Sequence, residues 1–157
     1  LLLLNNIINT QKIIDMLKKI LSISGKPGLY KLVSQGKNML IVESLLTGKR
    51  IPAYAHDKVI SVGDIAIFTE GGEAPLPDVM NKIKEKENGG VASVSTKAED
   101  KVLRNYFAEI LPDFDRERVY TTDIKKLLGW YNLLVEKGLT DFVEERTEED
   151  SSAEKAE

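Results

Sequence analysis

Turn-forming residues interrupt the first half of this chain at short intervals. Gly, Pro and Asn gather in clusters at residues 24–28, 35–38, 47–49 and 62–64. Glycine and proline are the strongest turn signals, so each interval between clusters has room for a short strand and not for a long helix. The sequence therefore predicts a small β unit in this half.

Five short strands are predicted, at residues 17–23, 29–34, 39–42, 50–55 and 65–68. Four or five strands at this spacing are typical of a small SH3-like β-barrel or of a strongly bent sheet. Pro52 lies inside the fourth strand. Because proline cannot donate a hydrogen bond to a ladder, we expect this strand at a sheet edge or a bulge.

The second half changes to a helical period. Apolar residues recur at i, i+3, i+4 and i+7 from Leu76 to Ile83, which predicts a helix that faces a core. A capping box with Thr96 as N-cap starts a second predicted helix, which ends at Pro112. A third helix is predicted from Thr121 or Thr122 to Gly138, and a short strand at 91–94.

These patterns predict an α+β fold in which a small SH3-like barrel or bent sheet precedes a helical C-terminal unit. The β unit is expected at residues 16–70, a linker with one helix and a short strand at 71–95, and the helical unit at 96–142. Residues 1–15 are expected to be an upstream extension, with Met16 as the native start. Residues 143–157 contain few apolar side chains and many acidic ones, which predicts a disordered acidic tail.

Charge is distributed unevenly along the chain. The net charge is −3, yet residues 16–60 hold eight Lys or Arg residues against Glu43 and Asp57, a net charge of +6. Such asymmetry favours contact with a polyanion. It is equally consistent with lysines that simply solvate a small sheet.

Seven residues of the β unit are candidates for nucleic-acid contact, because cations beside aromatic rings can follow a phosphate backbone and stack a base. They are Lys26, Lys31, Lys37, Lys49, Arg50, Tyr30 and Tyr54. The two tyrosines fit core or rim packing equally well. The leading hypothesis is a non-enzymatic binding module that contacts RNA, DNA or a ribonucleoprotein.

The last predicted helix supports an alternative hypothesis. Trp130 widens its apolar stripe, and Leu133 falls among polar residues on the opposite side. An exposed leucine beside an aromatic-rich stripe is a possible partner surface, although single exposed leucines are common. The alternative is therefore a protein–protein adaptor or a self-associating module that uses the C-terminal helices.

The composition excludes several kinds of chemistry. The chain has no cysteine and one histidine, which removes disulfides, thiolate metal sites and cysteine nucleophiles. His56 has no Gly-x-Ser-x-Gly turn to act with, so a surface or turn role is favoured. Asp113, Asp115, Glu117 and Asp123 interleave with Arg116 and Arg118, which favours ion pairs over a metal site. We therefore expect no enzymatic activity, no cofactor and no metal. Apolar runs are too short to span a bilayer, so no membrane partner is expected.

Three stretches of the chain carry a resemblance to known proteins. They read MLKKILSISGKPGLYKLVSQGKNMLIVESL, TGKRIPAYAHDKVISVGDIAIFT and YFAEILPDFDRERVYTTDIKKLLGWYNLLVEKGLTDF. Together, over about residues 16–142, they resemble an uncharacterised family of short Bacteroidetes proteins known only as a domain of unknown function. The resemblance implies a cytoplasmic bacterial protein and supports Met16 as the start. It implies no activity, cofactor or site residue.

Overall fold

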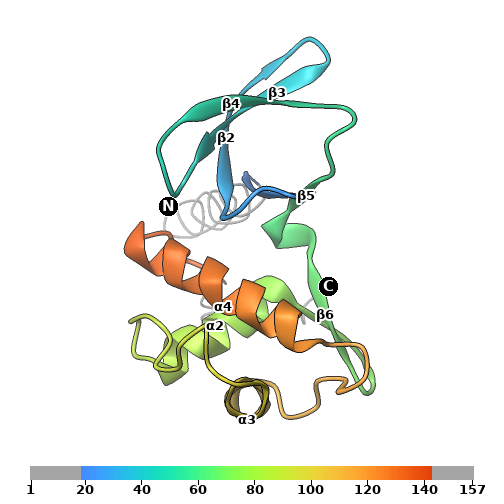
Figure 1. The fold of residues 1–157 in the computed structure, drawn as a ribbon, viewed down its shortest axis with the longest axis vertical. Helices are drawn as coiled ribbons and strands as arrows, with labels where there is room; N and C mark the ends of the chain where they lie inside the picture. Colours follow the sequence, from blue (N-terminus) through green and yellow to red (C-terminus); the bar gives the residue numbers. More distant parts are fainter. Residues whose placement is uncertain (1–18, 143–157) are drawn as a thin grey trace, which may run out of the picture.

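A computed structural model of the chain describes residues 19–142 (Figure 1). The predictions for residues 1–15 and 143–157 lie outside this range. The described chain forms a five-stranded antiparallel sheet, a two-stranded sheet and three α-helices. The predicted α+β class is therefore confirmed.

The larger sheet has the strand order β4-β3-β2-β1-β5. Its strands are β1 (Ile20–Ile23), β2 (Tyr30–Gly36), β3 (Met39–Ser44), β4 (Arg50–Tyr54) and β5 (Val59–Ser61). The turns between the first four strands fall at the predicted clusters. Asn38 and Gly48 adopt the left-handed conformation, with φ of 65° and 74°, which asparagine and glycine tolerate better than other residues.

The larger sheet is open. β4 and β5 are its two edges, and no ladder joins them within residues 19–142. Of the two predicted forms of the β unit, the structure therefore has the sheet and not the closed SH3-like barrel. Pro52 lies on the edge strand β4, as its missing N–H requires.

The chain leaves the larger sheet after β5. The 3₁₀ turn η1 (Val62–Asp64) redirects it, and the strand predicted at 65–68 becomes β6 (Ala66–Thr69). β6 pairs with β7 (Gly72–Pro75) in a separate two-stranded sheet. The linker prediction missed β7, and the short β5 was not predicted either.

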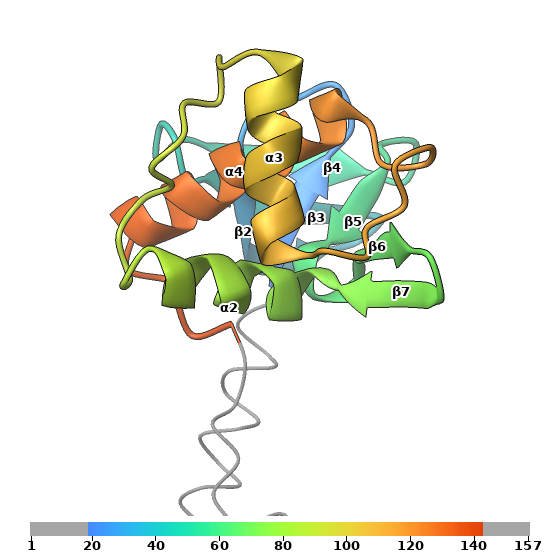
Figure 2. The same ribbon diagram turned by 90° about the horizontal axis from the view of Figure 1, so that it is seen from below.

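The three helices pack together below the larger sheet (Figures 1 and 2). They are α2 (Leu76–Lys86), α3 (Asp100–Ile110) and α4 (Thr121–Glu136). Most residues of their predicted apolar stripes are buried; in α3, for example, Leu103, Phe107 and Ile110 face the core, whereas Val102, which was also predicted for this stripe, is 47% exposed. All three predicted helices are thus confirmed.

Two local predictions in this half are wrong. Thr96 is not an N-cap, because α3 begins at Asp100 and Glu99 precedes it. The Ser95 hydroxyl accepts a hydrogen bond from the Lys97 N–H at 3.1 Å, and this local turn competes with a helix that starts earlier. The strand expected at 91–94 is irregular chain instead.

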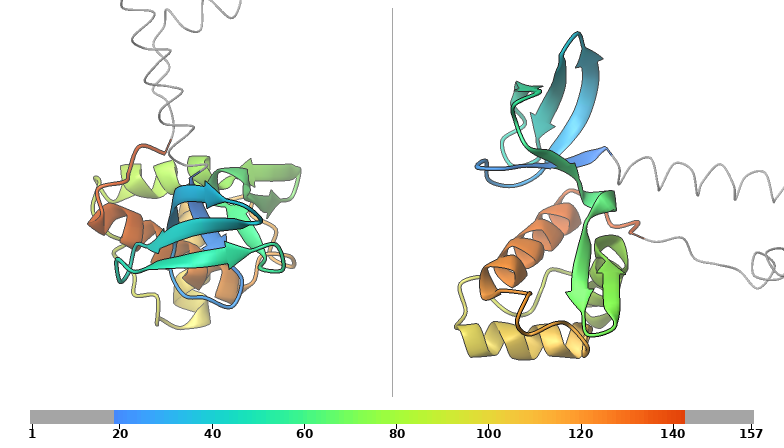
Figure 3. Two further views of the ribbon diagram at one scale, coloured as in Figure 1. Left: turned by 90° about the horizontal axis from the view of Figure 1, so that it is seen from above. Right: turned by 90° about the vertical axis from the view of Figure 1, so that its right-hand side faces the viewer.

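Two hydrophobic cores hold the structure. The smaller core lies on one face of the larger sheet and contains Tyr30 and Val42 among its buried residues. The larger core joins all three helices and also includes Ile20 of β1, Leu29 of the β1–β2 connection and Val62 of η1. Figure 3 shows α4 between the larger sheet and α3, so α4 is the element along which the two halves of the chain meet.

Candidate functional site

The acidic loop after α3 uses its charges locally. The Asp115 carboxylate lies 2.8 Å from the Arg118 guanidinium, whereas the Asp123 carboxylate accepts a hydrogen bond from the Tyr120 N–H at 2.9 Å. Arg116 stacks over the Phe114 ring, with 4.0 Å between the guanidinium carbon and the ring centre. No group of three metal-ligating side chains occurs among residues 19–142. The predicted ion pairing is therefore observed between Asp115 and Arg118, whereas Asp123 and Arg116 make other local contacts.

Asp115 makes a testable contribution to pH-dependent stability. The hydrogen bond from the Arg118 side chain holds the pKa of Asp115 below its ordinary value, and the backbone N–H groups of Arg118 and Glu117 add to this effect. A lowered pKa in the folded state stabilises the protein above the unfolded pKa of about 3.9, and this stabilisation is lost as pH falls further. We expect Asp115→Asn to lower the free energy of unfolding at pH 7 and to flatten its decline below pH 4. Urea unfolding at pH 7, 4 and 3 measures the free energy of unfolding and its fall with pH, and Asp113→Asn is the control. The prediction is contradicted if the free energy of unfolding falls in parallel with pH in Asp115→Asn and in the wild type.

His56 lies on the surface. Its ring stacks on Tyr54 with 5.7 Å between ring centres, and its Nε2 is 3.8 Å from an Asp57 oxygen. The turn itself is held by Asp57, whose carboxylate accepts a hydrogen bond from the Tyr54 N–H at 2.8 Å. This arrangement matches the surface role predicted for the histidine.

The seven residues predicted for nucleic-acid contact do not share one surface. Lys31, Glu43 and Arg50 are register partners across β2, β3 and β4, so an acid separates the two cations. The Arg50 Nε atom lies 3.3 Å from a Glu43 oxygen. The charge of these two cations is therefore partly neutralised within the sheet.

The remaining predicted residues lie at opposite ends of the sheet. Lys26 and Lys49 occupy turns at the end nearest α4, whereas Lys37 and Tyr54 lie at the far end of the β2–β3 hairpin. Tyr30 is only 6% exposed and packs in the smaller core, so its ring is not available to stack a base. Of these residues, only Lys26 reaches the site described next.

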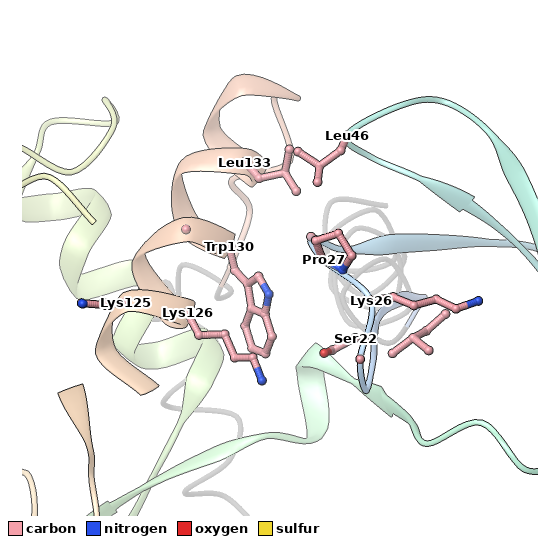
Figure 4. Close-up of a pocket in the computed structure, with 12 residues that line it drawn as sticks. Ser22, Lys26, Pro27, Leu46, Lys125, Lys126, Trp130 and Leu133 are labelled. Carbon is pink, nitrogen blue, oxygen red and sulfur yellow. The ribbon is translucent and has the colours of Figure 1, made fainter. Parts of the chain in front are cut away.

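A pocket of about 590 Å³ lies between α4 and the β1–β2 turn (Figure 4). The side of the sheet contributes residues of β1, of the β1–β2 turn and of the β3–β4 turn: Ser22, Ile23, Gly25, Lys26, Pro27, Gly28 and Leu46. Lysines on its rim are Lys26, Lys125 and Lys126, and no residue among the described lining carries a carboxylate. The pocket is therefore apolar inside and cationic at its edge.

Helix α4 presents one continuous face to this pocket. Lys126, Gly129, Trp130 and Leu133 are spaced at i, i+3, i+4 and i+7, which places them on the same side of a helix. Leu133 was predicted to be exposed, but it is only 5% exposed because the β1–β2 turn and Leu46 cover this side of α4. The prediction of an exposed Leu133 is wrong, although the residue does line the pocket.

Trp130 brings a large ring with one polar N–H group to the helix side of the pocket. In Figure 4 its indole faces across the pocket toward Pro27, and the indole nitrogen lies on the side that faces the cavity. No described residue accepts a hydrogen bond from this N–H. The Lys126 amine lies 5.7 Å from the ring centre, while Lys26 and Lys125 extend outward from the rim. A hydrogen-bond donor and a cation thus stand next to each other on one wall.

A second pocket of about 250 Å³ adjoins the first. It lies between β6 and α4, and it shares Lys126 and Trp130 with the larger pocket. Arg118 lies on its wall, 4.3 Å from the centre of the half-exposed Phe68 ring. Asp123 also lines it, but its carboxylate is engaged by the Tyr120 N–H. We call the two pockets together the α4 groove.

Gly28 shapes the edge of the larger pocket. It has a φ of +76°, and a Cβ atom there would lie 2.5 Å from Leu46 Cδ1. Gly25, in the same turn, has a φ of +82° but nothing within 4 Å of the position that a Cβ would take. We expect Gly25→Ala to cost about 1–2 kcal/mol of stability from backbone strain alone.

Gly28→Ala has the same strain and also displaces Leu46, so its expected cost is about 2–3 kcal/mol. Chemical denaturation of the two variants measures the difference, and Trp130 fluorescence reports the change in the pocket. Equal stability and equal fluorescence in the two variants would show that Leu46 does not pack as described.

Sequence reasoning found part of this site and missed the rest. Lys26, Trp130 and Leu133 were predicted, but in two separate hypotheses that the structure brings together. Lys125, Lys126 and Gly129 were missed. The available signal was Gly129, because a glycine inside a helix costs about 1 kcal/mol relative to alanine and is therefore an unusual residue at that position.

Comparisons with known proteins match nearly the whole described chain. Residues 17–62 match a domain of unknown function (DUF5606), and residues 65–134 match a second one (DUF6852). A protein from Bacteroides vulgatus with a solution NMR structure is 62% identical, with a TM-score of 0.68, and the match covers 82% of this chain and 92% of that one. The comparison with curated proteins found no match.

None of the helices in residues 19–142 is long and apolar enough to cross a membrane.

Proposed function

Since the chain carries the two domains of unknown function DUF5606 and DUF6852 and belongs to one family with the Bacteroides vulgatus protein, which is 62% identical, we propose a function from its own geometry. The protein is a non-enzymatic binding module that holds an acidic peptide segment of a partner protein in the α4 groove. This proposal develops the adaptor hypothesis for the C-terminal helices, and the α4 groove is the surface that we propose for it. The predicted resemblance to a Bacteroidetes family is confirmed by the same matches.

The observation that carries the proposal is the lining of the larger pocket. Its walls are apolar, its rim carries three lysines, and no described lining residue carries a carboxylate. Such a site favours a ligand that combines an apolar group with negative charge. An acidic peptide with one large apolar side chain has both features.

A peptide fits better than a nucleic acid. Sequence-independent binding of single strands uses several aromatic rings along a cationic track. Here Trp130 is the one aromatic residue in the larger pocket, Tyr30 is buried, and Tyr54 lies at the far end of the sheet. The apolar side chains of Pro27, Leu46 and Leu133 suit a leucine or phenylalanine side chain instead.

Nucleic-acid binding stays the second candidate. Its specific support is the pair of Lys126 and Trp130, because a cation beside an aromatic ring can also hold a stacked base and its phosphate. A cytoplasmic location and self-association likewise remain proposals, and light scattering of the full chain measures the latter.

Selection from random pools tests the main proposal and needs no candidate ligand at the start. A displayed random-peptide library and a random pool of single-stranded DNA are each panned against the wild-type protein and against Trp130→Ala. We expect enrichment of peptides that combine Asp or Glu with a large apolar residue, on the wild type only. Salt should weaken their binding because the contact is partly electrostatic.

Two results would overturn the proposal. One is enrichment that is equal on wild type and Trp130→Ala, which would place binding elsewhere. The other is enrichment of DNA with none of peptides, which would favour the second candidate.

A further inference from the structure

We propose that the α4 groove is a two-pocket site, divided by Trp130 and opened by Gly129, that takes an extended acidic peptide with apolar side chains at positions i and i+2. This inference rests on the proposed function and specifies its ligand.

Gly129 has no structural reason to be glycine. It lies in the interior of α4, its φ is not in the left-handed region, and nothing lies within 4 Å of the position a Cβ would take. An alanine there would fit and would favour the helix, so glycine lowers stability without a packing benefit. It does line the larger pocket, beside Trp130.

The missing side chain therefore adds space to the pocket. Gly129 lies one helical turn after Lys126 and one helical turn before Leu133. These residues share the face of α4 that lies opposite the β1–β2 turn across the pocket. Because Gly129 lines the larger pocket and nothing lies within 4 Å of the position of its Cβ, we expect a methyl group there to occupy part of the pocket. Gly129 is thus a specificity-determining position that keeps room for a large ligand side chain.

Trp130 and Lys126 form the wall between the two pockets, because both residues line both of them. A ligand that fills the groove must place one apolar group on each side of this wall. In an extended peptide, the side chains of residues i and i+2 point to the same side and are about 7 Å apart. This distance is enough for the two side chains to lie on opposite sides of the Trp130 ring. The side chain between them faces solvent.

The basic side chains of the α4 groove favour acidic residues on either side of the two apolar side chains of the peptide. Lys26, Lys125 and Lys126 stand at the larger pocket, and Arg118 stands at the smaller one. Arg118 is shared with Asp115, so the lysines are the cations most available to a ligand. Acidic residues that flank the two apolar anchors would lie near these amines, and a carboxylate could also accept the Trp130 N–H.

Three synthetic peptides and the full chain test the inference. Each peptide has eight residues, of which six are glutamates and two are leucines. In the first peptide the leucines are adjacent, in the second they stand at i and i+2 with one glutamate between them, and in the third they are the two terminal residues. Trp130 is the single tryptophan of the chain, so its fluorescence reports binding at the groove directly. We expect the peptide with leucines at i and i+2 to bind at least tenfold more tightly than the other two.

Variants of the protein separate the contribution of Gly129 to peptide binding from that of Lys126. We expect Gly129→Ala to weaken the i, i+2 peptide at least tenfold while its melting temperature stays the same or rises. Lys126→Glu should weaken it at least tenfold, whereas Lys137→Glu, a matched change just after the same helix and outside the groove, should weaken it less than twofold. A fold defect cannot mimic this result, because Gly129→Ala is expected to be at least as stable as wild type.

The outcomes distinguish this inference from the proposed function. Equal affinity for the three peptides, or unchanged binding by Gly129→Ala, overturns the two-pocket site and leaves an acidic-peptide module. If none of the peptides changes the fluorescence and the library selection also fails, both proposals fall. A response to a single-stranded oligonucleotide alone overturns both as well and supports nucleic-acid binding.

Discussion

Replacing Phe107 with alanine is expected to lower the free energy of unfolding by about 3–5 kcal/mol, the usual cost of deleting a fully buried aromatic ring. Phe107 is 0% exposed, at the centre of the larger core. Its ring meets Phe114 edge to face, with 4.9 Å between ring centres, and this contact joins α3 to the loop that follows it. Because native domains are stable by only about 5–15 kcal/mol, this one change removes a large part of the total.

The same helix supplies a control. Val102 is 47% exposed on the outer face of α3, so Val102→Ala should change stability by less than about 0.5 kcal/mol. Urea unfolding followed by circular dichroism measures both variants. A loss below about 1 kcal/mol for Phe107→Ala would mean that the core around α3 is not packed as described.

Arg104→Ala is expected to lower the free energy of unfolding by about 1.5–3 kcal/mol, the range for hydrogen bonds that involve a charged group. The Arg104 guanidinium donates to the backbone oxygens of Arg116 and Val119, at 3.3 and 3.2 Å. Its Nε atom also donates to Asp100 and to the Thr121 hydroxyl, each at 3.2 Å. One side chain therefore ties α3 to the acidic loop and to the start of α4.

Two further variants test the geometry of this contact. Arg104→Lys keeps the charge but lacks the planar fork, so we expect it to recover less than half of the lost stability. Lys101→Ala, one turn earlier and exposed, should have little effect. Full recovery by lysine would show that charge alone stabilises the loop, contrary to the prediction.

The helices could be predicted because their signal is local. Each has an apolar stripe at a helical period, and the buried residues of α2 and α3 are those that the stripes indicate. Their ends were less predictable. The turn at Ser95 delayed the start of α3, since a side chain that bonds to its own backbone competes with helix formation.

The sheet was harder to predict because its pairing is not local. The first four strands follow from their turns, but β5 and β7 have only three and four residues, too few for a period to appear. β5 pairs with β1, which lies about forty residues earlier, and not with its neighbour in sequence β4, so a barrel and an open sheet cannot be told apart from local patterns. The sequence also left open whether Tyr30 is buried, which depends on the face of β2 that meets the smaller core.

The α4 groove could not be predicted as a unit because its two walls are about a hundred residues apart in sequence. Lys26 and Trp130 each stood out, one by charge and the other by size. Their proximity depends on α4 lying against the β1–β2 turn, as the shared lining of the pocket shows. The burial of Leu133 has the same cause, since a helical wheel treats one helix alone and cannot include a second covering surface.

The open sheet has a consequence for how copies of this protein behave at high concentration. An unpaired strand edge invites a neighbouring chain to extend the sheet, which is the first step of fibril growth. Here Pro52 interrupts the backbone donors of β4, and β5 offers only three residues. We therefore expect each edge of the larger sheet to resist intermolecular strand addition, by a different means at β4 and at β5.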